Sequence, residues 1–331
     1  MMTKHFLLAL SVVPLLLPAA TQSSVKGEDA FRSIVRAPNA WIASLIEIPS
    51  GRMCAADTNR HHIACFQKDG ARLSTFGGLG QGPGELQYPS ALGLVKGEKI
   101  VVLDSDNYRI QSFRLDGGYL SGFPITSFSD SLTVLDGQLI AVNTPQAQAL
   151  AVVHNLEGIK VGTIGQLASS KLGYPNRPER GPRVPMNRAY LASTQDAGLV
   201  VAYQFMPVVQ VWNRDGSIRW TRRLTGVAID ELEKTFWGDS GATPAKSVKR
   251  IDGVRFSRVI TCVTVSRTGY IIVGLANRTI AVVDPRGNQV HLRDSRERLD
   301  VEPQAINHDG SFLFMASPGQ VSVSGKPFPL M

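Results

Sequence analysis

The chain has 331 residues and is 43% hydrophobic, and its 35 Lys and Arg residues against 27 Asp and Glu residues give a net charge of +8. Three cysteines are too few for a small domain that depends on a disulfide framework. The basic excess lies in residues 177–331, which hold 21 Lys and Arg residues against 14 Asp and Glu residues. We therefore expect an anionic partner, such as an acidic small molecule, a glycan or an acidic surface.

Residues 1–22 contain the three parts of an export signal. Lys4 and His5 precede the apolar run 6–17, and small residues then lead into a polar stretch. A membrane anchor is the competing interpretation, but Pro14 interrupts the run, which is shorter than the roughly 20 apolar residues of a spanning helix. We predict a signal peptide at 1–22 and a periplasmic or extracellular protein that is not embedded in a membrane. Export also argues against nucleic acid as the partner.

Two stretches that follow, 52–70 and 99–117, repeat with an offset of 47 residues. Asp57 in the first corresponds to Asp104 in the second, and both stretches end in Asp-Gly. A fixed period of this length is typical of stacked supersecondary units, none of which can bury its apolar face alone.

The cysteines of the first repeat flank its turn symmetrically, so Cys54 and Cys65 could face each other across a hairpin. Export permits their oxidation, but disulfide geometry is specific, and both a disulfide and two free thiols remain open. Cys262 lies in an apolar run, where we expect it to pack as a small hydrophobic side chain.

The rest of the chain continues as short Val- and Ile-rich segments separated by Gly, Asp, Asn and Pro, which indicates many antiparallel strands. They group into blades of four strands at 40–76, 89–124, 130–164, 188–224 and 258–292, and a sixth, three-stranded group covers 303–324. The stretch 31–35 precedes the first blade, and its pairing with the last blade would close a ring and cover exposed sheet edges. The predicted fold class is all-β, with one six-bladed β-propeller domain of four-stranded antiparallel blades over 23–331.

Two insertions, near 165–188 and 225–258, stretch the spacing of the blades. The first is rich in Pro and Arg, which disfavours a regular helix. The second has apolar residues at 229, 232, 236 and 237, which indicates one short amphipathic helix. In propeller geometry both insertions lie on the same face as the turns 57–62 and 104–109, which we call the insertion-bearing face. Long loops on a rigid scaffold often carry binding sites.

Blade two resembles an NHL repeat. Its lead, residues 76–89, reads Phe-Gly-Gly-Leu-Gly-Gln-Gly-Pro-Gly-Glu-Leu-Gln-Tyr-Pro, and an Asp-x-x-Asn-x-Arg-Ile pattern follows through Asp104, Asn107 and Arg109. Blade one matches the second half of the pattern from Asp57, and the other blades keep only the strand rhythm. The lead lacks the Gly-Lys-Ser/Thr ending of a phosphate-binding loop. We expect these repeat residues to be structural, with Asp and Asn capping tight turns.

Basic side chains gather on the insertion-bearing face, and the candidate ligand-binding residues are Arg177, Arg180, Arg183, Arg188, Arg255 and Arg258. The planar fork of Arg can donate two hydrogen bonds to a carboxylate or a phosphate. The leading hypothesis is a monomeric binding scaffold without a cofactor, whose partner is an anionic ligand or an acidic protein, peptide or glycan. The competing interpretation is a solvated basic loop with no ligand.

The alternative hypothesis is a metal-dependent hydrolase or lactonase. Related six-bladed propellers, the sugar lactonase and paraoxonase-like group, hold a divalent cation at the channel mouth with Glu, Asn and Asp. Similarity to that group would place Ca²⁺ on the hard oxygen ligands near the starts of the innermost strands, Asn39, Asp130, Asn187 and Glu302. None of the four lies in a motif of that group, and Arg258 at the channel mouth would oppose a cation. The histidines on this face show no zinc-ligand spacing.

Overall fold

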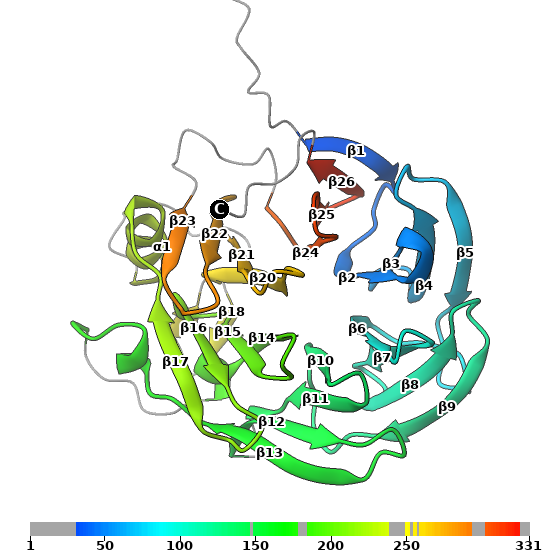
Figure 1. Cartoon of the computed structure of the whole chain (residues 1–331), viewed down its shortest axis with the longest axis horizontal. Coiled ribbons are helices and arrows are strands. Elements are labelled where there is room, and N and C mark those ends of the chain that lie inside the picture. Colours follow the sequence, from blue (N-terminus) through cyan, green and yellow to red (C-terminus); the bar gives the residue numbers. More distant parts are fainter. Residues whose placement is uncertain are drawn as a thin grey trace, which may run out of the picture.

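The computed structural model is a ring of six four-stranded antiparallel sheets around a central axis (Figure 1). It describes residues 31–145, 148–177, 184–237, 249–251, 254–256, 258–292 and 302–324. The predicted signal peptide lies outside the described residues. The sheets are the blades expected from the sequence, so the six-bladed β-propeller is confirmed.

Within blades one to five the strands run in chain order from the axis outward (Figure 1). Blade one has β2 (Ile42–Ile48), β3 (Arg52–Asp57), β4 (His62–Gln67) and β5 (Arg72–Gly77). Blade two has β6 (Pro89–Val95), β7 (Lys99–Asp104), β8 (Arg109–Arg114) and β9 (Tyr119–Pro124). Blade three has β10 (Leu132–Leu135), β11 (Leu139–Asn143), β12 (Ala149–His154) and β13 (Lys160–Gln166). Blade four has β14 (Ala189–Ser193), β15 (Leu199–Tyr203), β16 (Val208–Trp212) and β17 (Ile218–Arg223). Blade five has β20 (Ile260–Val265), β21 (Ile271–Leu275), β22 (Ile280–Val283) and β23 (Gln289–Leu292).

The last blade joins the two ends of the propeller. It consists of β24 (Ala305–His308), β25 (Leu313–Ser317), β26 (Gln320–Ser324) and, on its outer side, β1 (Phe31–Arg36). β1 pairs antiparallel with β26, and Figure 1 shows the blue β1 beside the red β26. The N-terminal strand therefore supplies the fourth strand that the C-terminal segments lack, and it closes the ring as predicted. The Gly70 turn of blade one lies against this strand, because a Cβ at Gly70 (φ 97°) would stand 1.9 Å from the carbonyl oxygen of Ile34.

The hydrophobic core lies between the blades. The second strands are buried along most of their length, and β15 and β21 are buried throughout. Ile63 and Phe113 belong to a cluster between blades one and two, while Phe66 and Phe314 belong to a cluster between blades one and six. Each sheet thus buries its two faces against its neighbours, which is why a single repeat could not fold alone.

The insertions add little regular structure to this scaffold. In the described part of the first insertion there are only 3-10 turns, Ser170–Leu172 and Val184–Asn187. The second contains α1 (Val227–Trp237) and a small hairpin of β18 (Lys249–Ile251) and β19 (Val254–Phe256). The sequence predicted the helix but missed the hairpin. No helix in the described part of the chain has the length and apolar character needed to cross a membrane.

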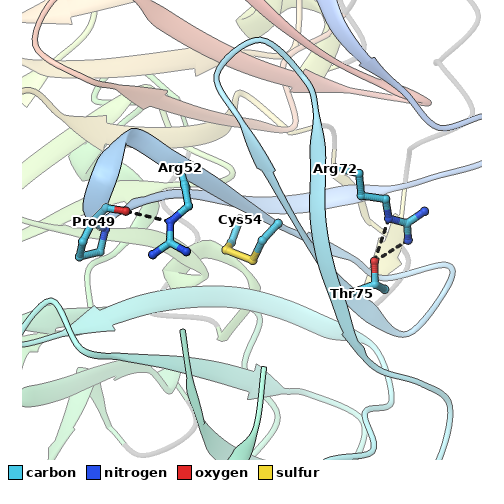
Figure 2. The surroundings of a disulfide bond; sticks show 6 residues. Pro49, Arg52, Cys54, Arg72 and Thr75 are labelled. Atoms are coloured by element: carbon cyan, nitrogen blue, oxygen red, sulfur yellow. Dashed lines mark hydrogen bonds between the residues drawn. A yellow bond between two sulfur atoms is a disulfide. The ribbon is translucent and has the colours of Figure 1, made fainter. Parts of the chain in front are cut away.

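A disulfide joins the two central strands of blade one. Cys54 on β3 lies directly opposite Cys65 on β4, their Cα atoms are 4.1 Å apart, and both side chains are buried (Figure 2). The structure thereby decides between the alternatives that the sequence left open. Cys262 is a buried free thiol, and burial raises its pKa to about 12, so it packs as a small hydrophobic side chain.

We expect the double substitution Cys54→Ala with Cys65→Ala to lower the free energy of unfolding by about 3 kcal/mol, because the bond closes a short loop in the unfolded chain. Urea titrations with and without dithiothreitol measure this effect. The reductant should lower the midpoint of the original chain and leave that of the double variant unchanged. Cys262→Ala is the control, since it should respond to dithiothreitol as the original chain does. A double variant that still responds would show that the stabilisation has another source.

Candidate functional site

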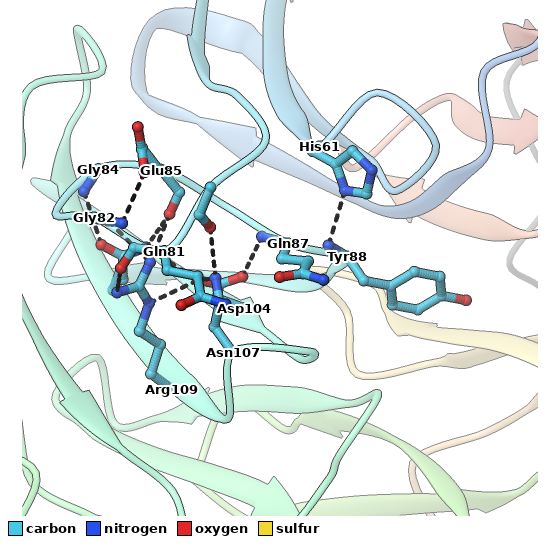
Figure 3. Close-up of polar contacts among 12 residues, drawn as sticks. His61, Gln81, Gly82, Gly84, Glu85, Gln87, Tyr88, Asp104, Asn107 and Arg109 are labelled. Atoms are coloured by element: carbon cyan, nitrogen blue, oxygen red, sulfur yellow. Dashed lines mark hydrogen bonds and ion pairs between the residues drawn. The ribbon is translucent and has the colours of Figure 1, made fainter.

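Asp104 anchors the loops of the insertion-bearing face in blade two. It is fully buried, and its carboxylate accepts a hydrogen bond from the backbone N–H of Gln87 at 2.6 Å and one from Asn107 at 2.9 Å (Figure 3). The guanidinium of Arg109 donates to the same carboxylate at 2.7 Å. Arg109 also donates to the backbone carbonyls of the glycine-rich lead, at Gln81, Gly82 and Glu85. The residues that carry the resemblance to the NHL repeat are therefore structural, as expected from the sequence.

Equivalent contacts place two aromatic side chains on the same face. The carboxylate of Asp57, at the position of Asp104 in blade one, accepts a hydrogen bond from the backbone N–H of Trp41 at 3.1 Å. Nδ1 of His61 accepts one from the backbone N–H of Tyr88 at 3.1 Å (Figure 3). The side chains of Trp41 and Tyr88 are 39% and 37% exposed. We call this pair the aromatic rim.

The innermost strands of the six blades enclose a central channel with a cavity of about 250 Å³. Hydroxyl groups on its wall connect neighbouring blades. Oγ of Ser44 accepts a hydrogen bond from the backbone N–H of Leu92 at 3.0 Å, and Oγ of Ser131 accepts one from Leu191 at 2.8 Å. These bonds brace the wall from one blade to the next, and the wall also carries aliphatic side chains such as Leu45 and Ile306.

The channel mouth is a smaller pocket of about 40 Å³ at the insertion-bearing end of the channel. It shares Ala43, Ser90, Asp130 and Tyr190 with the channel wall, so the two spaces are continuous. The remaining residues that line the mouth are Trp41, Tyr88, Arg258, Thr261, Glu302 and Gln304. All of these lining residues except Ala43 carry a polar side-chain atom.

At the mouth, neighbouring side chains compensate the negative charge of Asp130. Its carboxylate forms an ion pair with Arg188 and accepts weak hydrogen bonds from Nε2 of Gln204 at 3.3 and 3.4 Å. The Arg188 guanidinium also lies 5.8 Å from the centre of the Phe128 ring. Both charged side chains are largely buried, and their opposite charges cancel, so this pair attracts an incoming anionic ligand only weakly.

Arg258 is the second guanidinium at the mouth, and its surroundings differ. It is half-buried, and it makes no hydrogen bond or ion pair with another described residue. The pKa of Arg258 is raised, first by the nearby Tyr190 and then by the carboxylates of Asp130 and Glu302. Arg258 is therefore permanently charged, and its donors remain open toward the pocket.

The acceptors of the mouth lie around this guanidinium. Burial raises the pKa of Tyr190 to about 12, so Tyr190 presents a neutral hydroxyl group. Burial also raises the pKa of the Glu302 carboxyl, against the opposing influence of Arg258. Gln304 is only 9% exposed, and its Oε1 atom has no hydrogen-bond partner in the part of the chain that the structure describes. The mouth thus offers one open cation beside one unpartnered acceptor, Oε1 of Gln304, and beside the carboxyl group of Glu302.

The structure gathers only part of the predicted basic cluster at the mouth. Arg258 lines the mouth, and Arg188 lies beside it in its ion pair with Asp130. Arg177 is half-buried in the first insertion and has its own interactions. Arg255 belongs to β19. Arg180 and Arg183 lie outside the described residues. Among the described residues, the candidate anion site centres on Arg258.

Two of the four predicted metal ligands lie at the channel mouth, and the other two do not. Asp130 and Glu302 line the channel mouth, whereas Asn39 and Asn187 do not. The carboxamide of Asn187 is fully buried and bonds the backbone of Ala168 at both ends, at 2.8 and 3.0 Å. Asn39 is an exposed turn residue with φ 65°. Among the described residues no group of three or more His, Cys, Asp or Glu side chains comes together.

Sequence reasoning missed Trp41, Tyr88, Tyr190 and Gln304. These residues lie at or just before the starts of innermost strands, the same place in the blade that Asp130 and Arg258 occupy. An alignment of the starts of the innermost strands in all six blades places these four residues at equivalent positions. No motif marks these positions, because each blade contributes only one or two residues to the mouth.

Solved structures share this fold at low identity. A crystal structure of RRP9 WD40 repeats has a TM-score of 0.58 and 12% identity, over 91% of this chain and 99% of that chain. An inactive virginiamycin B lyase from Staphylococcus aureus with quinupristin has a TM-score of 0.55 and 9% identity, over 86% of this chain and 95% of that chain. A streptogramin B lyase structure has a TM-score of 0.53 and 13% identity, over 87% and 80%. These likenesses show the fold alone. No family model and no curated protein matches the chain.

Proposed function

We propose that this propeller is an exported binding scaffold of NHL type and that it binds an anionic group of its ligand at the channel mouth. The observation that carries the proposal is Arg258, a half-buried guanidinium that makes no hydrogen bond or close ion pair with another described residue, although Asp130 and Glu302 lie near enough to influence it. A buried or half-buried charge is normally paired, because the loss of hydration is costly. A ligand carboxylate or phosphate would supply that partner.

Of the two guanidinium groups near the mouth, only that of Arg258 is available to bind an anionic group of a ligand. Arg188 already pairs with Asp130, so removing Arg188 would release a negative charge near the ligand. Arg258 faces the pocket, where partial exclusion of water strengthens a charge-assisted hydrogen bond. WD40 propellers and lyases share this fold, so the fold itself is compatible with a protein, peptide or glycan partner and with catalysis.

We expect Arg258→Ala to weaken the binding of small anions by about 10- to 100-fold, as the loss of one charged hydrogen-bonding partner implies. Thermal-shift and calorimetric titrations with acetate, inorganic phosphate and methyl glucuronide measure the effect. Arg214→Ala is the matched control, because it removes the same charge from an exposed ion pair with Asp136 on the opposite face. The proposal fails if none of the three anions binds the original chain, or if their binding survives Arg258→Ala.

The alternative proposal, a calcium-dependent hydrolase or lactonase, now rests on Asp130 and Glu302, the two predicted ligands that line the mouth. Both face a guanidinium, since Arg188 pairs with Asp130 and Arg258 influences Glu302. A positive charge beside each carboxylate opposes a divalent cation. A calcium titration separates the two proposals, because a calcium-dependent rise in melting temperature would favour the enzyme.

A further inference from the structure

We propose that the ligand is a saccharide with a uronic acid unit, a pyranose that carries a carboxylate on C5, and this inference rests on the proposed anion site. Two features of the mouth point to this class: the acceptors beside Arg258 and the aromatic rim.

The narrow mouth suits a small anionic group. It has a volume of about 40 Å³ and opens into the channel cavity of about 250 Å³. The proposal places the carboxylate next to Arg258 and the rest of the ligand at the outer end of the mouth. A planar carboxylate also matches the fork of the guanidinium, which can donate two parallel hydrogen bonds to it.

The acceptors beside Arg258 require a ligand that also brings donors. Oε1 of Gln304 is buried without a partner among the described residues, and Glu302 lines the same pocket. A buried acceptor without a donor costs roughly 1–3 kcal/mol. A uronic acid carries a hydroxyl group on C4, adjacent to the carbon that bears the carboxylate, and this hydroxyl can donate to such an acceptor. A simple carboxylate such as acetate cannot.

The aromatic rim then accounts for the part of the ligand that stays outside. Trp41 and Tyr88 line the mouth, and each exposes more than a third of its surface. One face of a pyranose consists largely of C–H groups, which can be buried against an aromatic ring, while its hydroxyl groups remain in water.

The same lining argues against a peptide carboxylate. Peptide recognition relies on apolar pockets for anchor side chains or on a free strand edge. Apart from Ala43, the residues that line the mouth all carry polar atoms, and none of them is an aliphatic residue larger than alanine. Among the described residues, a peptide would find aliphatic partners such as Leu45 and Ile306 only in the channel behind the mouth, so the test below includes a peptide carboxylate.

Calorimetry or saturation-transfer NMR with four probes tests this inference on the folded chain. The probes are methyl glucuronide, methyl glucoside as its neutral match, acetate, and N-acetyl-diglycine as a peptide carboxylate. Methyl glucuronide should bind at least 10-fold more tightly than each of the other three. Trp41→Ala should remove most of this preference by weakening the binding of methyl glucuronide far more than that of acetate, whereas Arg258→Ala should weaken both equally.

The outcomes distinguish this inference from the proposed function. Equal binding of acetate and methyl glucuronide would overturn the uronic acid while leaving the anion site intact. Tighter binding of N-acetyl-diglycine would instead assign the site to peptides. Absence of binding by every anion would overturn the proposed function itself. Leu120→Ala, at an exposed position on the outer strand β9, is the control for loss of a surface hydrophobic side chain.

Discussion

A chain that lacks β1 is expected to lose on the order of 5 kcal/mol of its free energy of unfolding and to melt about 10–20 °C lower. β1 contributes the outer ladder of the last blade, with five paired positions along β26. Ile34 and Val35 also pack against the cluster between blades one and six. Without β1 the ring stays open, and β26 exposes a free edge to other chains.

Circular dichroism melts and light scattering compare a chain that begins at residue 37 with a control that begins at residue 29. The control keeps β1 and removes a similar leader, so the leader itself is not being tested. The truncated chain should also associate as its concentration rises, because a free strand edge is a template for pairing. Equal melting temperatures and a monomeric truncated chain would contradict the closure of the ring by β1.

Asp104→Ala is expected to lower the free energy of unfolding by about 3–5 kcal/mol, the range found when one partner of a buried ion pair is removed. The substitution leaves Arg109 without its carboxylate, and it leaves the donors of Asn107 and Gln87 without their acceptor. Arg109 and Asn107, which also bond the carbonyls of the glycine-rich lead, then lose the carboxylate that holds them in place (Figure 3).

Chemical denaturation of Asp104→Ala and Asp104→Asn measures this effect. Asp104→Asn keeps the shape and one acceptor oxygen, so it should cost less than Asp104→Ala. Arg114→Ala is the control, because its ion pair with Asp116 is exposed at both ends and contributes at most about 1 kcal/mol. An Asp104→Ala chain as stable as the original would show that this residue does not anchor the loops.

Most of the fold could be predicted from the sequence, because the strands and turns of a propeller have local sequence patterns. The spacing of Val- and Ile-rich segments predicted the blades, and the Asp-Gly turns predicted the hairpins between their outer strands. The β18–β19 hairpin was missed because its strands have only three residues each, too short for a period to be visible. The predicted basic cluster did not single out Arg258, because sequence proximity within a loop says little about which side chain reaches the axis.

The sequence by itself determined the ring, its closure by the N-terminal strand and the face that bears the insertions, since each follows from the order of short local patterns. Only the tertiary structure decided the site. Asp130 and Arg188 are 58 residues apart, and their pairing depends on the positions of two separate blades. That pairing distinguishes Arg188 from Arg258, which meets the open pocket instead. Such a difference depends on how side chains from separate blades meet around the axis. Each blade contributes only one or two residues to the mouth, so no local sequence pattern predicts the difference.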